Sequence, residues 1–420
     1  MIGWTARLVR SDGALAASSN GVKSLGRLAA TIVVARIGGV DAVGLLTITI
    51  AIEAILISTL NAMFASPAAV LCPGRRRSLR AIIHTEAERM QLVSGVVLAA
   101  GTAIAGLVAG LDPVLSIILA AYLSLAITYQ ARRSTRLTEF RSGRVFAAEL
   151  LIAVLGLAGP LAALLFELDP VALFWSAQAA AHLIGIIWLP SAARSAAPAP
   201  RATRIAQGML LTTGRAMVMG SLANSLSLRS HAFLISFLLG REAVGLFGAA
   251  STFAAPIRML SGALRGVMLP RFAQRQRSGG ELNRDRRVML AALLGVAASA
   301  WVADLLAPLM IGVVYGSEFE GAAVLVPLCV VLALLAMMSS IVACTRQAAG
   351  ESGAVARIRV VCALVTPVLF GFGLMTGGLA YGLSWCIIAE LACLLVLWSP
   401  RSGKVRARGR QDRPLQPALR

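Results

Sequence analysis

The chain has 420 residues, of which 58% are hydrophobic and only 14% charged, and its formal net charge is +20. A soluble globular protein carries about 25% charged residues, so this composition excludes a soluble enzyme. Nucleic acid is not an expected partner, because the arginines stand in short runs between long apolar stretches and aromatic residues make up only 5% of the chain.

Twelve apolar segments are long enough to cross a bilayer as helices. The hydrocarbon core is about 30 Å thick, and a helix needs roughly 20 mostly apolar residues to span it with its backbone polar groups satisfied. The segments are 14–36, 44–66, 91–110, 113–129, 146–166, 170–190, 208–237, 245–268, 288–312, 321–344, 358–376 and 378–398. We therefore expect an all-α, polytopic membrane protein.

The sixth connection predicts a division into two halves. Residues 191–207 read SAARSAAPAPRATRIAQ, and this Pro, Ala and Arg content is typical of a linker. The predicted organisation is an N-terminal six-helix bundle over 1–190, a cytoplasmic linker over 191–207, a C-terminal six-helix bundle over 208–398 and a basic cytoplasmic tail over 399–420.

The arginines predict the orientation in the membrane. They gather in alternate connections, in the linker and in the tail, whereas the remaining connections hold mostly acids, with Arg241 as the clear exception. Lys and Arg are retained on the cytoplasmic side. Both termini are therefore expected in the cytoplasm, with no cleaved signal peptide at the start of the chain.

A short internal repeat supports the two-half organisation. Residues 39–45 read GVDAVGL and residues 240–246 read GREAVGL, which is an offset of 201 positions. Both copies follow the first helix of their half. Because six crossings separate them, both halves have the same orientation, and a pseudo-two-fold axis along the membrane normal should relate them. This arrangement favours a transporter with a cavity between two bundles.

Three stretches resemble a known family. They are TIVVARIGGVDAVGLLTITIAIEAI at 31–55, LISFLLGREAVGLFGAASTFAAPIRMLSGALRGVMLPRFAQ at 234–274 and VVYGSEFEGAAVLVPL at 313–328. With them the chain resembles the polysaccharide, or lipid-linked oligosaccharide, flippases of the multidrug/oligosaccharidyl-lipid/polysaccharide exporter superfamily. Val43 and Val244 stand where the family often has an aromatic residue. His231 stands where it often has an Asp, which weakens any transfer of a cation-coupling role to that position.

The resemblance implies alternating access and export of an undecaprenyl-pyrophosphate-linked glycan across the bacterial inner membrane, for surface or exopolysaccharide biosynthesis. The implied partners are that lipid-linked glycan, the membrane lipids, and a polysaccharide polymerase with its export machinery. Nucleic acid is not among them.

Several basic residues fall inside the predicted helices. A lipid-facing guanidinium costs on the order of 3 kcal/mol at the bilayer centre, so these side chains should face a wet interior. Steps of three or four residues place them with polar residues on single helix faces. The predicted cavity residues are Asn20, Lys23, Arg27, Ser225, Arg229, Arg258 and Arg265. Arginines suit an anion such as pyrophosphate, which they can bind in a bidentate manner.

Alternatives remain open for individual residues. Lys23 and Arg265 are near enough to the cytoplasmic face to extend toward it. Arg27 is either a ligand contact or the partner of Glu53 in a structural ion pair, and both roles are compatible. Glu53, His231 and Glu390 are candidates for ion coupling or for structural pairing.

Other functions compete with the flippase hypothesis. A multidrug or metabolite antiporter of the same superfamily should carry more carboxylates in its cavity, and a lipid II flippase is barely separable by sequence. A membrane-embedded glycan polymerase or glycosyltransferase normally needs longer outer loops than this chain has. The sequence has no G-x-x-x-x-G-K-[ST] or H-E-x-x-H motif and no C-x-x-C pair, so we expect no enzyme, cofactor or metal site.

Overall fold

The computed structural model describes residues 2–72, 77–108, 110–139, 141–191, 200–258, 261, 286–348 and 351–399. Within these ranges the chain is helical, with short connections. The elements are α1 (Ile2–Leu60), the π-helix η1 (Asn61–Ala65), α2 (Ser66–Leu71), α3 (Arg77–Val108), α4 (Pro113–Thr138), α5 (Ser142–Phe166), α6 (Pro170–Trp188), α7 (Pro200–Leu239), α8 (Arg241–Phe253), α10 (Arg286–Val314), the 3-10 helix η3 (Ser317–Ala322), α11 (Leu325–Ala348) and α12 (Ser352–Trp398).

Nine helices in the described residues are long and apolar enough to cross a membrane. Two of them turn back on themselves, because Gly39 in α1 has φ 66° and Gly378 in α12 has φ 76°, a left-handed conformation that favours glycine. Each therefore supplies two crossings. The predicted all-α polytopic fold is confirmed. The segment predicted at 245–268 is described only in part, since most of its second half lies outside the described residues.

Two sequence predictions differ from the structure in detail. The outer connections expected near residues 37–43 and 376–378 are helix kinks at single glycines, because a glycine with positive φ reverses the chain without a loop. Helix α7 begins at Pro200, so part of the segment predicted as a linker is helical.

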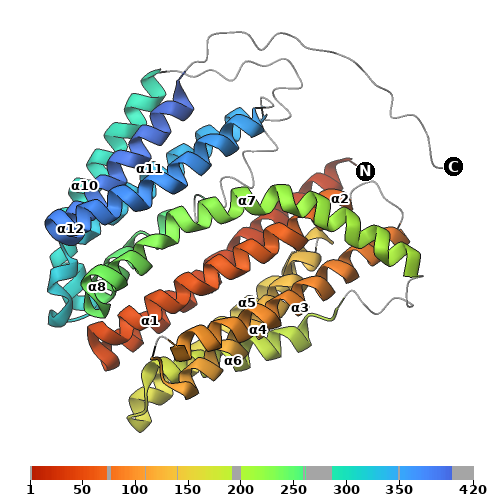
Figure 1. Cartoon of the computed structure of the whole chain (residues 1–420), viewed down its shortest axis with the longest axis horizontal. Helices are drawn as coiled ribbons and strands as arrows, with labels where there is room; N and C mark the ends of the chain where they lie inside the picture. Colours follow the sequence, from red (N-terminus) through yellow and green to blue (C-terminus); the bar gives the residue numbers. More distant parts are fainter. Residues whose placement is uncertain are drawn as a thin grey trace.

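The helices form two groups that meet along α1, α7 and α8. Helices α3 to α6 pack with α1, while α10, α11 and α12 make their main described contacts with one another and with α7, α8 and η3. In Figure 1 the teal helix α10 and the blue helices α11 and α12 diverge from α3 to α6, with α1 and α7 between them. A buried apolar cluster joins the groups near the kink of α1, where Val43 packs with Val244 and Phe319.

The internal repeat lies at this contact and is reciprocal. A Cβ added at Gly44 would lie 2.2 Å from the carbonyl oxygen of Arg241, and one added at Gly245 would lie 2.0 Å from that of Val40. Residues 40 and 241, and residues 44 and 245, are each 201 positions apart. Such an exchange of equivalent contacts is what a two-fold relation produces. The structure therefore confirms the repeat, and we call this contact the glycine seam.

Candidate functional site

Arg27 forms a buried ion pair with Glu53 across the fold of α1. The kink at Gly39 makes the two segments of this helix run back along each other, which brings the two side chains together. A guanidinium nitrogen of Arg27 lies 2.7 Å from Oε2 of Glu53 and donates to the Tyr122 hydroxyl at 3.2 Å. The Glu53 side chain is 3% exposed and that of Arg27 is 22% exposed. The ion pair foreseen as one alternative is present, while a substrate contact of Arg27 stays a prediction.

A second buried ion pair lies on the same half of the chain. Nε of Arg133, on α4, is 2.7 Å from Oε1 of Glu149, on α5. The Arg133 guanidinium also donates to Oδ1 of Asn20 at 2.6 Å. Asn20, predicted as a cavity residue, therefore joins α1 to α4. Arg133 lies beyond the segment 113–129 that was predicted to cross the membrane, but α4 continues to Thr138, and the Arg133 side chain is only 8% exposed because it pairs with Glu149.

Lys23 lies between these two ion pairs. It is half-buried and within electrostatic range of both Glu53 and Glu149. No described carboxylate comes within ion-pair distance of its ammonium group. With Arg27, Gln178 and His182, it lines a small pocket between α1, α5 and α6.

Arg229 and Arg258 occupy the other half and have no acidic partner among the described residues. Arg229 is half-buried on α7, and Arg258 is exposed just after α8, where it donates to the carbonyl oxygen of Ser251. Arg229 lies within electrostatic range of Arg258 and also of Arg27 and Glu53. The structure thus brings together charged residues of both halves that the sequence placed on separate helices.

The two halves differ in charge at this point. Glu53 neutralises Arg27, whereas the residue 201 positions after Glu53 is the buried Ala254. The repeat position in the C-terminal half therefore offers no carboxylate to Arg229 or Arg258. An excess of positive charge in this place suits an anionic group that arrives as a ligand.

Ser225 contacts the N-terminal half. Its hydroxyl is 2.5 Å from the hydroxyl of Ser58 on α1, and the neighbouring Ser221 donates to the carbonyl oxygen of Ser58 at 3.1 Å. Ser225 is 8% exposed. In this arrangement it ties α7 to α1.

The remaining predicted residues lie elsewhere or outside the description. His231 is buried against α12, with its Nε2 3.2 Å from Sγ of Cys386 and its ring beside Phe370. Glu390 accepts a hydrogen bond from Ser339 and lies 3.6 Å from the guanidinium of Arg359. Both are thus engaged in contacts within the C-terminal half. Arg265 is outside the described residues.

Sequence reasoning missed an arginine clamp in each half. Arg132 on α4 donates to the carbonyl oxygen of Ile186 at 2.6 Å, at the end of α6. Arg346 on α11 donates to that of Ser399 at 2.8 Å, just after α12. A cation at a helix C-terminus satisfies carbonyls that lack an intrahelical partner. One sequence feature could have pointed to these two equivalent helix ends. A Trp-x-Pro sequence at 188–190 recurs at 398–400, an offset of 210 positions.

The end of the interface near the kink of α1 holds another arginine that bridges the halves. Nε of Arg36, near the kink of α1, donates to the carbonyl oxygen of Val314 at 2.9 Å, and its Nη2 donates to that of Val313. These carbonyls end α10. Together with the glycine seam, Arg36 holds the two halves together at this end.

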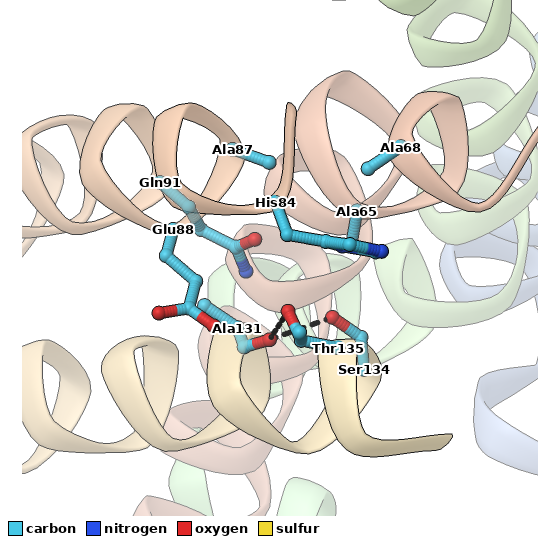
Figure 2. Close-up of a pocket in the computed structure, with 9 residues that line it drawn as sticks. All are labelled: Ala65, Ala68, His84, Ala87, Glu88, Gln91, Ala131, Ser134 and Thr135. Atoms are coloured by element: carbon cyan, nitrogen blue, oxygen red, sulfur yellow. Dashed lines mark hydrogen bonds between the residues drawn. The ribbon is translucent and has the colours of Figure 1, made fainter. Parts of the chain in front are cut away.

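A second pocket lies at the other end of the N-terminal half, between α3, α4, η1 and α2. Figure 2 shows His84, Glu88 and Gln91 on one side of it, facing Ser134 and Thr135 on the other. The two hydroxyls donate to the carbonyl oxygen of Ala131, within their own helix. Gln91 donates to Asn61 at 3.0 Å, and Ser191 donates to Glu88 at 2.6 Å. The hydrogen bonds of Gln91 and Glu88 therefore connect separate segments of the chain, whereas those of Ser134 and Thr135 stay within α4.

The comparisons with known proteins agree with this architecture. The sequence profile of a family described as "Polysaccharide biosynthesis protein" matches residues 87–324, which is more than half of the chain. No curated protein matches.

Solved structures show the same fold at low sequence identity. An inward-facing multidrug resistance MATE family transporter of the MOP superfamily has a TM-score of 0.70 and 15% identity, covering 92% of this chain and 96% of that chain. A MOP superfamily transporter from Pyrococcus furiosus has a TM-score of 0.63 and 15% identity, over 93% of each chain. The lipid II flippase MurJ, in an inward closed conformation, has a TM-score of 0.68 and 12% identity, covering 91% of this chain and 86% of that chain. The chain therefore belongs to the polysaccharide biosynthesis protein family and has the multi-pass membrane fold of the multidrug/oligosaccharidyl-lipid/polysaccharide (MOP) exporter superfamily.

Proposed function

We propose that this protein is a flippase that moves a polyprenyl-pyrophosphate-linked oligosaccharide from the cytoplasmic to the outer leaflet of the bacterial inner membrane. One observation carries the proposal. Arg229 lies within electrostatic range of Arg258 and of the Arg27–Glu53 ion pair, and no described acid forms an ion pair with either Arg229 or Arg258. Family membership supports a role in polysaccharide biosynthesis.

The charge of the site selects among substrates. A pyrophosphate offers several oxygens that guanidinium groups bind in bidentate fashion, and its negative charge balances the excess positive charge of Arg229 and Arg258. A cationic or neutral drug offers neither. The same reasoning applies to any polyprenyl-pyrophosphate glycan, so lipid II is the second candidate, favoured by the similarity in fold to a lipid II flippase.

The contacts between the halves support a mechanism of alternating access. In the described structure Arg36 and the glycine seam join the halves at the kink of α1, which we propose to be the outer side. Outward opening requires these contacts to separate while the pyrophosphate stays near Arg229. An inside-negative potential favours outward movement of an anion by about 2.3 kcal/mol per charge per 100 mV.

Both termini are proposed to lie in the cytoplasm, and a polysaccharide polymerase with its export machinery would take the product on the outer side. This protein needs no catalytic group of its own for that task, since flipping breaks no covalent bond.

The test is flipping in proteoliposomes. A fluorescent polyprenyl-pyrophosphate oligosaccharide is incorporated, and its arrival in the opposite leaflet is read by a membrane-impermeant quencher. Losing a hydrogen-bonded charge contact of about 1.5–3 kcal/mol slows transport about tenfold or more, which is the effect expected for Arg229→Ala and for Arg258→Ala.

Arg357→Ala is the matched control, because Arg357 is exposed near the start of α12. It should transport at the wild-type rate. Parallel liposomes with lipid II decide between the two candidate glycans. Wild-type protein that flips neither lipid, or arginine variants that flip at full rate, contradict the proposal.

A further inference from the structure

Among the described residues, the charged groups around Lys23 carry one positive charge more than the nearby carboxylates neutralise. The described charged groups with the largest electrostatic effect on Lys23 are Arg27, Arg133, Glu53 and Glu149. Each of the two carboxylates lies 2.7 Å from an arginine and is balanced by it. The excess charge therefore falls on the ammonium group of Lys23. A half-buried cation without a counter-charge is costly inside a membrane protein unless a ligand supplies one.

The pocket around this ammonium group is preformed, and polar side chains line it together with the apolar Ile152 and Ala153. Besides Lys23 and Arg27, it is lined by Gln178 and His182 of α6, which are 5% and 1% exposed. The His182 ring is fixed by a 2.7 Å hydrogen bond between Nδ1 and the Gln178 carbonyl oxygen. Its faces and edges pack against Tyr122 and Tyr129, with ring centroids 5.4 Å and 5.3 Å away. These contacts hold the lining in one arrangement.

The position of the pocket relates it to the proposed pyrophosphate site. Lys23 is four residues, or about 6 Å along the helix, from Arg27 on the same face. Arg27 in turn lies within electrostatic range of Arg229. A glycan attached to a pyrophosphate at Arg229 and Arg258 can therefore extend past Arg27 toward Lys23. The pocket is small, so it suits a compact charged group and not a whole sugar ring.

We propose that this pocket binds the carboxylate of an acidic sugar in the glycan, so that the substrate carries a negative charge on its sugars as well as on its pyrophosphate. The proposal rests on the proposed flippase function and names its substrate class. Lys23 supplies the charge, and the Gln178 amide is a further group in the pocket that can donate to a carboxylate.

The experiment compares two synthetic lipids in the same proteoliposomes. Both are polyprenyl-pyrophosphate oligosaccharides of equal length, and they differ only in a hexuronic acid that replaces one hexose. The measured quantity is the ratio of the two flipping rates, in which any loss of folded protein cancels. Wild-type protein should prefer the acidic lipid. Lys23→Gln should lower the ratio about tenfold or more, because a charge-assisted contact is lost, and Lys23→Arg should retain most of it.

The possible outcomes separate this proposal from the flippase function. If Lys23→Gln slows both lipids equally, Lys23 acts on the shared pyrophosphate, and the sugar-acid proposal is overturned. If the variant slows neither, the pocket holds no part of the substrate, which also overturns it. If wild-type protein flips the neutral lipid as fast as the acidic one, the flippase function stands and the sugar-acid proposal fails. Wild-type protein that flips neither lipid removes the flippase function itself.

Discussion

Replacing Glu53 by Gln is expected to leave the charge of Arg27 buried without a counter-charge. Removing one partner of a buried ion pair costs about 3–5 kcal/mol. Arg27 is 22% exposed and keeps its contact with Tyr122, so water and the hydroxyl retain part of its solvation. We therefore expect a loss near the lower end of that range, about 3 kcal/mol.

The double variant Arg27→Gln/Glu53→Gln distinguishes the roles of Arg27. Without both charges, two neutral amides can bond to each other and to Tyr122, so the double variant should be more stable than Glu53→Gln alone. A coupling energy of about 1–3 kcal/mol between the two substitutions is expected for groups in direct contact.

Two measurements are needed for each variant: thermal unfolding in detergent, and the flipping rate in liposomes. A purely structural Arg27 predicts that the double variant recovers both stability and transport. An Arg27 that also binds substrate predicts recovered stability with transport still slowed. Additive effects on stability, with no coupling between the two substitutions, would refute the conclusion that the pair is a stabilising ion pair.

Other substitutions test the interface and the helix ends. Gly44→Ala and Gly245→Ala should each hinder closure of the glycine seam to a similar extent, because the added Cβ atoms would meet carbonyl oxygens at 2.2 Å and 2.0 Å. Labelling of an engineered outer cysteine should rise in both, but not in Gly101→Ala, whose Cβ meets nothing within 4 Å. Arg346→Ala should lower the thermal unfolding temperature, since a side chain that is 1% exposed loses its bonds to the end of α12, at a cost of about 1.5–3 kcal/mol. An unchanged unfolding temperature would show that this clamp contributes nothing to stability.

Residues that share one face of a helix could be predicted from the sequence. Contacts between residues on different helices could not. The Lys23 and Arg27 face of α1 follows from helical spacing alone. That Arg133 reaches Asn20 depends on how α4 packs against α1, which no local pattern encodes. Likewise, His231 shares a helix with Arg229 but lies against α12, because a two-residue step turns a side chain to another face.

The membrane class, the apolar segments of the described helices and the internal repeat could all be predicted without a structure. Each depends on local properties: the length of apolar segments, the placement of arginines and the recurrence of a short motif. Which charges are balanced became visible only in the packing of the helices. Arg27 is neutralised by Glu53 because a single glycine kink folds α1 back on itself, whereas Arg229 and Arg258 meet no described acid. Whether a charged side chain is neutralised depends on which other side chains the fold brings within a few ångströms of it. Coulomb interactions are strong at such distances inside a membrane protein, so the packing of the helices decides which charges are balanced.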